Sequence, residues 1–202
     1  MKHTLYLGSS SLSRQMLLRE ALIPFTLVSQ SADESQCDWN LSLEKVVESI
    51  ALYKMQHVIL PEGREGDICF VLTADTLTEN SLGKLEGKPT DRDDAVMKLK
   101  SSRNGVRTGT AFCLERRIFK SGAWHQDARI LTYAQGRYRF NVPDEAIDFY
   151  LDHVPVVGAG AIAIEGFGNQ FLEYVEGSYS AVVGLPMYEL RDSLHALGFF
   201  DL

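Results

Sequence analysis

The stretch LYLGSSSLSRQMLL, residues 5–18, places four serines and an arginine between two apolar runs. The first run predicts a strand over residues 4–7, and the second predicts a helix over residues 11–21. Where a strand leads into a helix, the first backbone N–H groups of the helix have no partner and carry the positive end of its dipole. The serine hydroxyls and Arg14 add further donors there. The stretch therefore favours an α/β fold and indicates an anion site.

A second interpretation of this stretch needs no ligand. Serines commonly cap the N-termini of helices, and an arginine in the first turn of a helix can point into solvent. The sequence alone leaves both interpretations open.

The rest of the chain alternates between strand-like and helix-like patterns, which is typical of an α/β fold with a mixed central sheet. A start resembling a capping box at Thr90 and Asp93 predicts one helix, and Pro143 is expected at the first position of another. Further helices are expected from about Ser42 to Val58 and from Pro186 to about Leu197. Strands are expected at 25–29, at 66–78 and over 107–140 with a turn at residues 121–122, and strands and loops are expected in the glycine-punctuated segments 158–168 and 171–184.

The totals describe an acidic chain of ordinary globular composition. It has 202 residues, 45% of them hydrophobic, and a net charge of -7. This length predicts one domain over residues 1–202, with two lobes that share one sheet and a cleft between them. The negative charge disfavours binding to polymeric nucleic acid.

Cysteine usage and hydropathy bear on the compartment. The three cysteines, Cys37, Cys69 and Cys113, are widely spaced, which favours reduced thiols over a disulfide framework. No apolar run reaches the roughly 18 residues of a membrane span. We therefore expect a cytoplasmic protein that does not bind a membrane.

Two lysines stand where a cation is unexpected. Lys54 falls on the inward stripe of its predicted helix, where the pattern calls for an apolar residue. Its aliphatic stem could be buried with the ammonium group in water. Lys88, in EGKP, lies in a turn just before a helix, and alone it would be read as a solvated loop residue. Either lysine becomes a candidate phosphate ligand if another group that binds anions lies beside it.

Acidic residues complete the set. Asp75, in VLTADT, is expected at the carboxyl end of an apolar strand, where α/β sheets bind ligands. A turn-forming aspartate is the alternative. Asp33 and Glu34 lie in a polar loop that could reach the same edge of the sheet. Carboxylates together with cations indicate magnesium-assisted chemistry on a polyphosphate, and the absence of the GxxxxGK[ST] pattern excludes a P-loop enzyme.

With these residues in view, the chain resembles the Maf family of nucleoside triphosphate pyrophosphatases nearly from end to end. The resemblance is carried by LGSSSLSR, by ADT followed by GKP, by YRFNVPDEAIDFYL, by GAGAIAIEGFG and by the tail VEGSYSAVVGLP. It implies an elongated, twisted, mixed sheet flanked by helices, as in inosine triphosphate pyrophosphatases, and often a homodimer. It also implies hydrolysis of a nucleoside triphosphate to the monophosphate and pyrophosphate with a divalent metal, Mg²⁺ or Mn²⁺.

The resemblance also implies roles for individual residues. Asp75, Lys54 and Lys88 would be catalytic, and Glu34 and Asp75 would hold the metal. The substrate and its phosphates would be bound by Ser9, Ser11, Arg14, Thr76 and Glu165.

Some positions depart from the family pattern. Ser13 stands where the family has an arginine, Gly158 where it usually has a lysine, and Glu165 where it has a glutamine. Losing one charge-assisted hydrogen bond costs ~1.5–3 kcal/mol. The alternative to an active pyrophosphatase is therefore a catalytically weak, nucleotide-binding regulatory protein of the same fold, related to cell division and septum formation.

Overall fold

The computed structural model describes residues 3–154 and 158–201. Its centre is a seven-stranded sheet in the order β2-β1-β3-β5-β6-β7, with β4 paired to β3 outside that path. β1 runs parallel to β2 and β3, and the other pairs are antiparallel. The predicted α/β class with a mixed sheet is confirmed. The strands are β1 (Thr4–Leu7), β2 (Thr26–Leu27), β3 (Ile68–Asn80), β4 (Leu85–Glu86), β5 (Val106–Lys120), β6 (Ala123–Phe140) and β7 (Leu172–Gly177).

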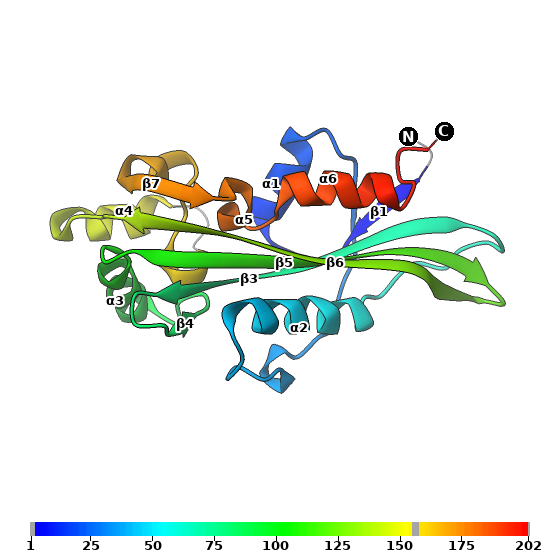
Figure 1. The fold of residues 1–202 in the computed structure, drawn as a ribbon, viewed down its shortest axis with the longest axis horizontal. Coiled ribbons are helices and arrows are strands. Elements are labelled where there is room, and N and C mark those ends of the chain that lie inside the picture. Colours follow the sequence, from blue (N-terminus) through cyan, green and yellow to red (C-terminus); the bar gives the residue numbers. More distant parts are fainter. Residues whose placement is uncertain (1–2, 155–157, 202) are drawn as a thin grey trace.

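Helices cover both faces of this sheet, and the molecule is elongated along the β5–β6 hairpin (Figure 1). α2 lies on one face, and α1 and α6 lie on the other, while α3, α4 and β7 gather at one end. The helices are α1 (Leu12–Glu20), α2 (Leu43–Gln56), α3 (Arg92–Ser102), α4 (Ile147–His153), α5 (Tyr179–Val183) and α6 (Met187–Ala196).

Three apolar clusters hold these layers together. One packs α2 against the sheet through residues such as Val46, Ile50 and Val71. The second fills the opposite face beneath α1 and α6, and the third joins α3, α4 and β6 around Tyr138 and Tyr150. Because buried apolar surface is the main driving force of folding, these clusters fix the sheet on which the site is built.

Two predicted helix starts are displaced. α3 is capped by Asp91, whose carboxylate accepts from Asp94 N at 2.8 Å, rather than by Thr90. Thr90 N instead donates to the Asp94 carboxylate at 2.9 Å. Pro143 caps a short 3₁₀ turn, Asp144–Ala146, and is not the first residue of α4. Both helices exist as expected; the Asp91 carboxylate fixes the start of α3, and the 3₁₀ turn after Pro143 delays the start of α4.

The strands and loops expected in 158–168 are only partly as predicted, because these described residues contain loops and two 3₁₀ turns, Ala159–Ala161 and Gly166–Phe171, but no strand. Gly160 has a φ of 67°, a left-handed conformation that suits glycine. The last part of the glycine-rich region does form a strand, β7, and then the helix α5.

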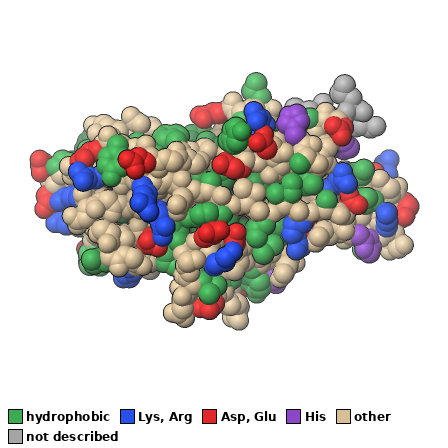
Figure 2. All heavy atoms as spheres, in the orientation of Figure 1, with side chains coloured by type: hydrophobic (Ala, Val, Ile, Leu, Met, Phe, Trp, Pro, Cys, Tyr) green, Lys and Arg blue, Asp and Glu red, His purple; other side chains and the backbone are tan. Residues whose placement is uncertain are grey.

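The surface carries charges of both signs. On the face shown in Figure 2, Lys and Arg side chains are interspersed with Asp and Glu and do not form one basic patch. Within residues 3–154 and 158–201, none of the helices combines the length and the apolar character needed to span a bilayer.

Candidate active site

A cleft of about 730 Å³ opens between the start of α1 and the segment that precedes β7. Many parts of the chain line it, among them the β1–α1 loop, the loop before α2, α2 itself, the centre of β3, the turn after β4, residues 158–165 and the end of α5. The cleft brings together all the predicted site residues, namely Ser9, Ser11, Arg14, Glu34, Lys54, Asp75, Thr76, Lys88 and Glu165.

Arg14 is buried at the base of the β1–α1 loop, with 7% of its surface exposed. Its Nε donates to the carbonyl oxygen of Gly184 at 2.8 Å, one Nη to Ser9 Oγ at 2.9 Å and the other to Thr76 Oγ1 at 2.9 Å. Ser11 caps α1, because its hydroxyl accepts from Arg14 N at 3.4 Å. The serines therefore both cap the helix and lie beside a cation that faces the cleft. Burial lowers the pKa of Arg14, and the negative charges of Asp75 and Glu34 act to raise it.

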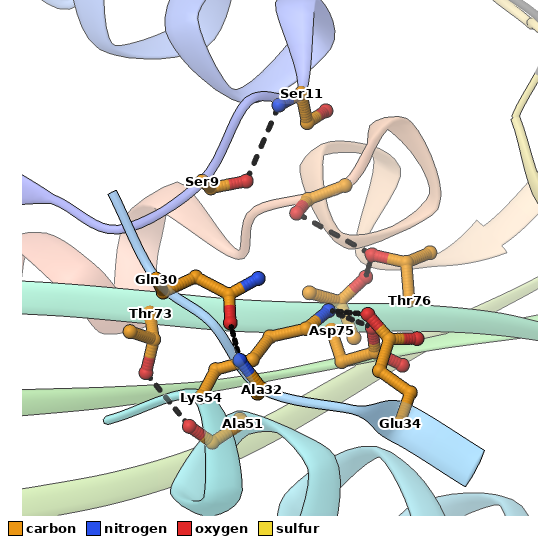
Figure 3. Close-up of polar contacts among 12 residues, drawn as sticks. Ser9, Ser11, Gln30, Ala32, Glu34, Ala51, Lys54, Thr73, Asp75 and Thr76 are labelled. Carbon is orange, nitrogen blue, oxygen red and sulfur yellow. Dashed lines mark hydrogen bonds and ion pairs between the residues drawn. The ribbon is translucent and has the colours of Figure 1, made fainter. Parts of the chain in front are cut away.

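Lys54 brings two carboxylates together (Figure 3). Its Nζ lies 2.7 Å from Asp75 Oδ1 and 2.8 Å from Glu34 Oε1. Lys54 comes from α2, Asp75 from β3, and Glu34 from a 3₁₀ turn, Glu34–Gln36. The inward position of Lys54 is thus explained by ion pairing within the cleft, where only 9% of its side chain is exposed.

Asp75 is a buried acid whose pKa depends on its burial and on neighbouring charges. Burial raises its pKa, and the positive charges of Lys54 and Arg14 oppose that rise. Its Oδ2 is buried and has no hydrogen-bond partner among the described residues. A lone carboxylate oxygen of this kind can accept a proton from water or bind a cation.

Asp75 does not lie at the carboxyl end of its strand as expected. β3 continues for five residues beyond it, to Asn80, and pairs with β5 throughout. The cleft crosses the middle of this long strand, where β1 ends beside it at Leu7. Asp75 therefore reaches the cleft because the shorter neighbouring strand stops, which a pattern within β3 alone does not reveal.

Lys88 lines the cleft from the turn after β4, and its side chain is exposed. A second lysine holds this turn in place. Lys98 Nζ, on α3, lies 3.3 Å from the carbonyl oxygen of Gly87, 3.2 Å from that of Lys88 and 2.7 Å from the Asp94 carboxylate. The backbone that carries Lys88 is thus anchored, while its exposed ammonium group makes no hydrogen bond or ion pair with another residue that the structure describes.

Comparison with known proteins shows the family of this chain. A family model described as "Maf-like protein" matches residues 4–197. The chain belongs to the Maf family. Its relatives include proteins named "dTTP/UTP pyrophosphatase". That of Caldicellulosiruptor bescii is 33% identical, with 96% of this chain and 95% of the relative covered. That of Hydrogenovibrio crunogenus is 34% identical with both chains fully covered, and that of Fusobacterium nucleatum is 30% identical, with 96% and 95% covered.

One departure from the Maf pattern has a direct structural counterpart. Ser13 Oγ donates to Glu165 Oε1 at 2.8 Å, which links α1 to the segment across the cleft. Ser13 occupies the position at which the resemblance predicts an arginine, so a hydroxyl replaces a cation and its partner is an acid. Together these two residues make one side of the Maf cleft less positive than the pattern implies.

Sequence reasoning missed several residues of this Maf site. Gly184 supplies the carbonyl for Arg14, and Thr110 lies behind Thr76 with their hydroxyl oxygens 2.8 Å apart. Trp39 and Tyr138 also line the cleft. A threonine or an aromatic residue in a strand or loop is ordinary, so these positions carry no signal until the strand register is known. Among these residues, only Gly184 lies in a motif that carries the family resemblance, VEGSYSAVVGLP.

Proposed function

We propose that this Maf protein hydrolyses pyrimidine nucleoside triphosphates between the α- and β-phosphates. The predicted activity, nucleoside triphosphate pyrophosphatase, makes it a hydrolase that acts on acid anhydrides. The observation that carries the proposal is the meeting of Arg14, Lys54, Lys88 and Asp75 around one cleft. The pyrimidine preference is taken from the names of the relatives, which are dTTP/UTP pyrophosphatases.

The cations hold the triphosphate. Arg14 is fixed at the bottom of the cleft, and Lys88 can follow the phosphates from the opposite side because its side chain is not bonded elsewhere among the described residues. The hydroxyl of Ser9 and the backbone N–H groups at the start of α1 add further donors. Charge neutralisation of this kind also stabilises the pyrophosphate as it leaves.

Asp75 activates the water. Its free Oδ2 accepts a proton as the water oxygen attacks the α-phosphorus, and the bond from that phosphorus to the bridging oxygen breaks. The products are the nucleoside monophosphate and pyrophosphate, and the proton on Asp75 returns to solvent. Lys54 holds the other oxygen of Asp75, which favours the ionised carboxylate and orients Oδ2.

The carboxylates suit the predicted divalent metal. Mg²⁺ and Mn²⁺ prefer oxygen ligands, and Mg²⁺ is often held by one or two carboxylates together with substrate phosphates. Asp75 Oδ2 and the half-buried Glu34 would supply these ligands. No group of three or more His, Cys, Asp or Glu side chains within the described ranges could hold a metal by itself. When bound, the metal would neutralise charge on the phosphates.

The second candidate is a catalytically weak nucleotide-binding protein, and the Ser13–Glu165 pair favours it. A carboxylate beside the phosphates repels them, so it weakens stabilisation of the transition state unless a cation intervenes. The roles in septum formation and as a homodimer remain predictions, to be tested by localisation in dividing cells and by the mass of the protein in solution.

A substrate panel distinguishes the two candidates. The purified protein is given dTTP, UTP, CTP, GTP and a methylated guanosine triphosphate with Mg²⁺ or Mn²⁺, and the released pyrophosphate is measured. We expect the highest kcat/KM with dTTP and UTP, and loss of activity after chelation of the metal. Tight binding by calorimetry without turnover of any nucleotide would contradict the enzyme and support the regulatory protein.

A further inference from the structure

Behind the cleft, two threonines on neighbouring strands connect Arg14 to the end of α5. Thr76 on β3 faces Thr110 on β5 as a cross-strand pair, with their hydroxyl oxygens 2.8 Å apart. Thr110 is fully buried, and its hydroxyl donates to the carbonyl oxygen of Ala181 at 2.6 Å. On the cleft side, Thr76 Oγ1 accepts from Arg14 at 2.9 Å. The four groups form one continuous chain of hydrogen bonds.

The direction of every bond in this chain is determined. A hydroxyl has one proton, and a backbone carbonyl can only accept. The proton of Thr110 is therefore committed to Ala181, so Thr110 can only accept from Thr76. The hydroxyl proton of Thr76 in turn points toward Thr110, and Thr76 offers only lone pairs to the cleft. Another acceptor for that proton, the Gly184 carbonyl oxygen, is 3.5 Å away and already accepts from Arg14.

This order changes the role expected for Thr76. A hydroxyl without a free proton cannot donate to a phosphate oxygen, but it is a good acceptor for a guanidinium group. Arg14 uses Thr76, Ser9 Oγ and the Gly184 carbonyl oxygen as three acceptors around its planar head group. Because all three lie at fixed positions, the plane of the guanidinium is fixed before an anion arrives.

We propose that Thr110 is a positioning residue for Arg14. It keeps the hydroxyl of Thr76 as an acceptor, and it thereby holds the guanidinium in the orientation in which it binds an anion. This inference rests on the proposed function only in taking that anion to be the triphosphate. The orientation of Arg14 itself is a property of the free protein and is measurable without a substrate.

The first experiment observes Arg14 directly. Nitrogen-15 NMR follows hydrogen exchange at the Nε–H and Nη–H groups of Arg14, assigned through Arg14→Lys. In Thr110→Val the shape of the side chain is kept and the hydroxyl is lost, so the Thr76 proton becomes free to rotate. We expect at least ~10-fold faster exchange of the Nη–H groups of Arg14, because a lost hydrogen bond of ordinary strength changes opening by about that factor. Thr110→Ser should retain the exchange rate of the original protein.

A matched control separates positioning from stability. Ser102 is fully buried, and its hydroxyl, like that of Thr110, has backbone carbonyl oxygens as acceptors, with Oγ 2.7 Å from Leu99 O and 2.8 Å from Phe140 O, but it does not line the cleft. Ser102→Ala is expected to lower the melting temperature without altering exchange at Arg14. Unchanged exchange at Arg14 in folded Thr110→Val, or equal acceleration in Ser102→Ala, would overturn the proposal.

The second experiment is a double-mutant cycle on kcat/KM. Thr110→Val should reduce kcat/KM for dTTP by ~10-fold or more in the original protein, as expected for a misplaced charged group. In an Arg14→Lys background, Thr110→Val should lower kcat/KM little further, because the guanidinium that Thr110 positions is already absent. Equal losses in both backgrounds would refute the proposal. If the original protein hydrolyses no nucleotide, the proposed function fails, and the NMR result still decides the role of Thr110.

Discussion

Lys54 Nζ and Asp75 Oδ1 lie 2.7 Å apart, and each side chain is 9% exposed. In such a buried pair neither charge is well solvated, so each depends on the other for stabilisation. Glu34 shares the same ammonium group but is half-buried, and its negative charge acts on Asp75 in the opposite direction. The pKa of Asp75 is therefore raised by burial and by Glu34 and lowered by Lys54 and Arg14, and the two ion-pair partners, Lys54 and Glu34, can be changed separately.

Replacing Lys54 should raise the pKa of Asp75. Burial already raises that pKa above the ordinary 3.8, and Lys54 counteracts the rise. Lys54→Met removes the counteracting charge, so the pKa should move further up, whereas Glu34→Gln should move it down. Carbon-13 NMR titration of the Asp75 carboxyl group measures both. Shifts of the same sign in the two variants would show that the ion pair does not govern Asp75.

The same shift has a consequence for stability. Since the folded-state pKa is raised, the folded protein binds this proton more tightly than the unfolded chain. The contribution of Asp75 to the free energy of unfolding should therefore fall as pH rises from about 3.8 through the folded-state pKa. Denaturant unfolding of the original protein and of Asp75→Asn across this range measures the contribution as the difference between their pH slopes. Equal pH slopes in the two proteins would show that the pKa of Asp75 does not differ between the folded and the unfolded states.

Asp75→Asn should nearly abolish turnover while nucleotide binding remains. The amide keeps the shape of the side chain but cannot accept the proton of the attacking water, which costs typically ~10²–10⁴-fold in kcat. We expect the Kd of a non-hydrolysable dTTP analogue, measured by calorimetry, to change only a few-fold. A kcat within ~10-fold of the original value would exclude Asp75 as the general base.

Glu165→Gln should improve the binding of triphosphate. The amide can still accept from Ser13, so the 2.8 Å contact across the cleft survives while one negative charge is removed. We expect KM for dTTP to fall several-fold at low ionic strength, and the gain to shrink as salt screens the charge. Steady-state kinetics at two salt concentrations tests this. A KM that rises at low salt would indicate that Glu165 accepts a hydrogen bond from the substrate.

Lys88→Ala should raise KM for the triphosphate by ~10-fold, the effect of one lost charge-assisted bond. Lys84 provides a matched control because it lies on the same hairpin, is exposed and does not line the cleft. Lys84→Ala changes the net charge equally and should leave KM within ~2-fold. Equal effects in the two variants would show that only the overall charge matters.

Gly168→Ala should displace the segment around Ala163, which lines the cleft. A Cβ at this position would lie 1.8 Å from the carbonyl oxygen of Ala163, so the backbone of a segment that lines the cleft must move. We expect a loss of ~2 kcal/mol or more in the free energy of unfolding, together with a higher KM. At Gly83 a Cβ meets nothing within 4 Å, so Gly83→Ala should cost only the ~1 kcal/mol of its left-handed backbone. Equal losses in the two variants would contradict the steric argument.

The charged part of the site was largely predictable from the sequence. Lys54 stands on the inward stripe of its helix, so a cation there conflicts with the hydrophobic pattern and requires a partner. Asp75 likewise places a charge within an apolar strand, and Arg14 follows a cluster of serines at the start of a helix, where an anion fits. These conflicts are local, and a single sequence reveals them.

What could not be predicted depends on long-range pairing. Thr110 matters because the β3–β5 register sets it opposite Thr76, and no local pattern fixes that register. The segment 158–168 has the apolar residues of a strand, but its backbone bonds to groups from other parts of the chain instead: Gly160 N donates to Gly87 O at 3.0 Å and Ala163 N to the Tyr150 hydroxyl at 2.9 Å. Tertiary contacts decided both cases, and they outweigh local propensity.

The hydrogen bond from Arg14 to the carbonyl oxygen of Gly184 spans 170 positions of the chain. A hydrogen bond of this sequence separation forms only once the polypeptide includes Gly184. A fragment that stops before Gly184 lacks the carbonyl oxygen that holds Arg14 Nε, so its guanidinium keeps fewer acceptors. We therefore expect such a fragment to bind a triphosphate more weakly than the 202-residue chain.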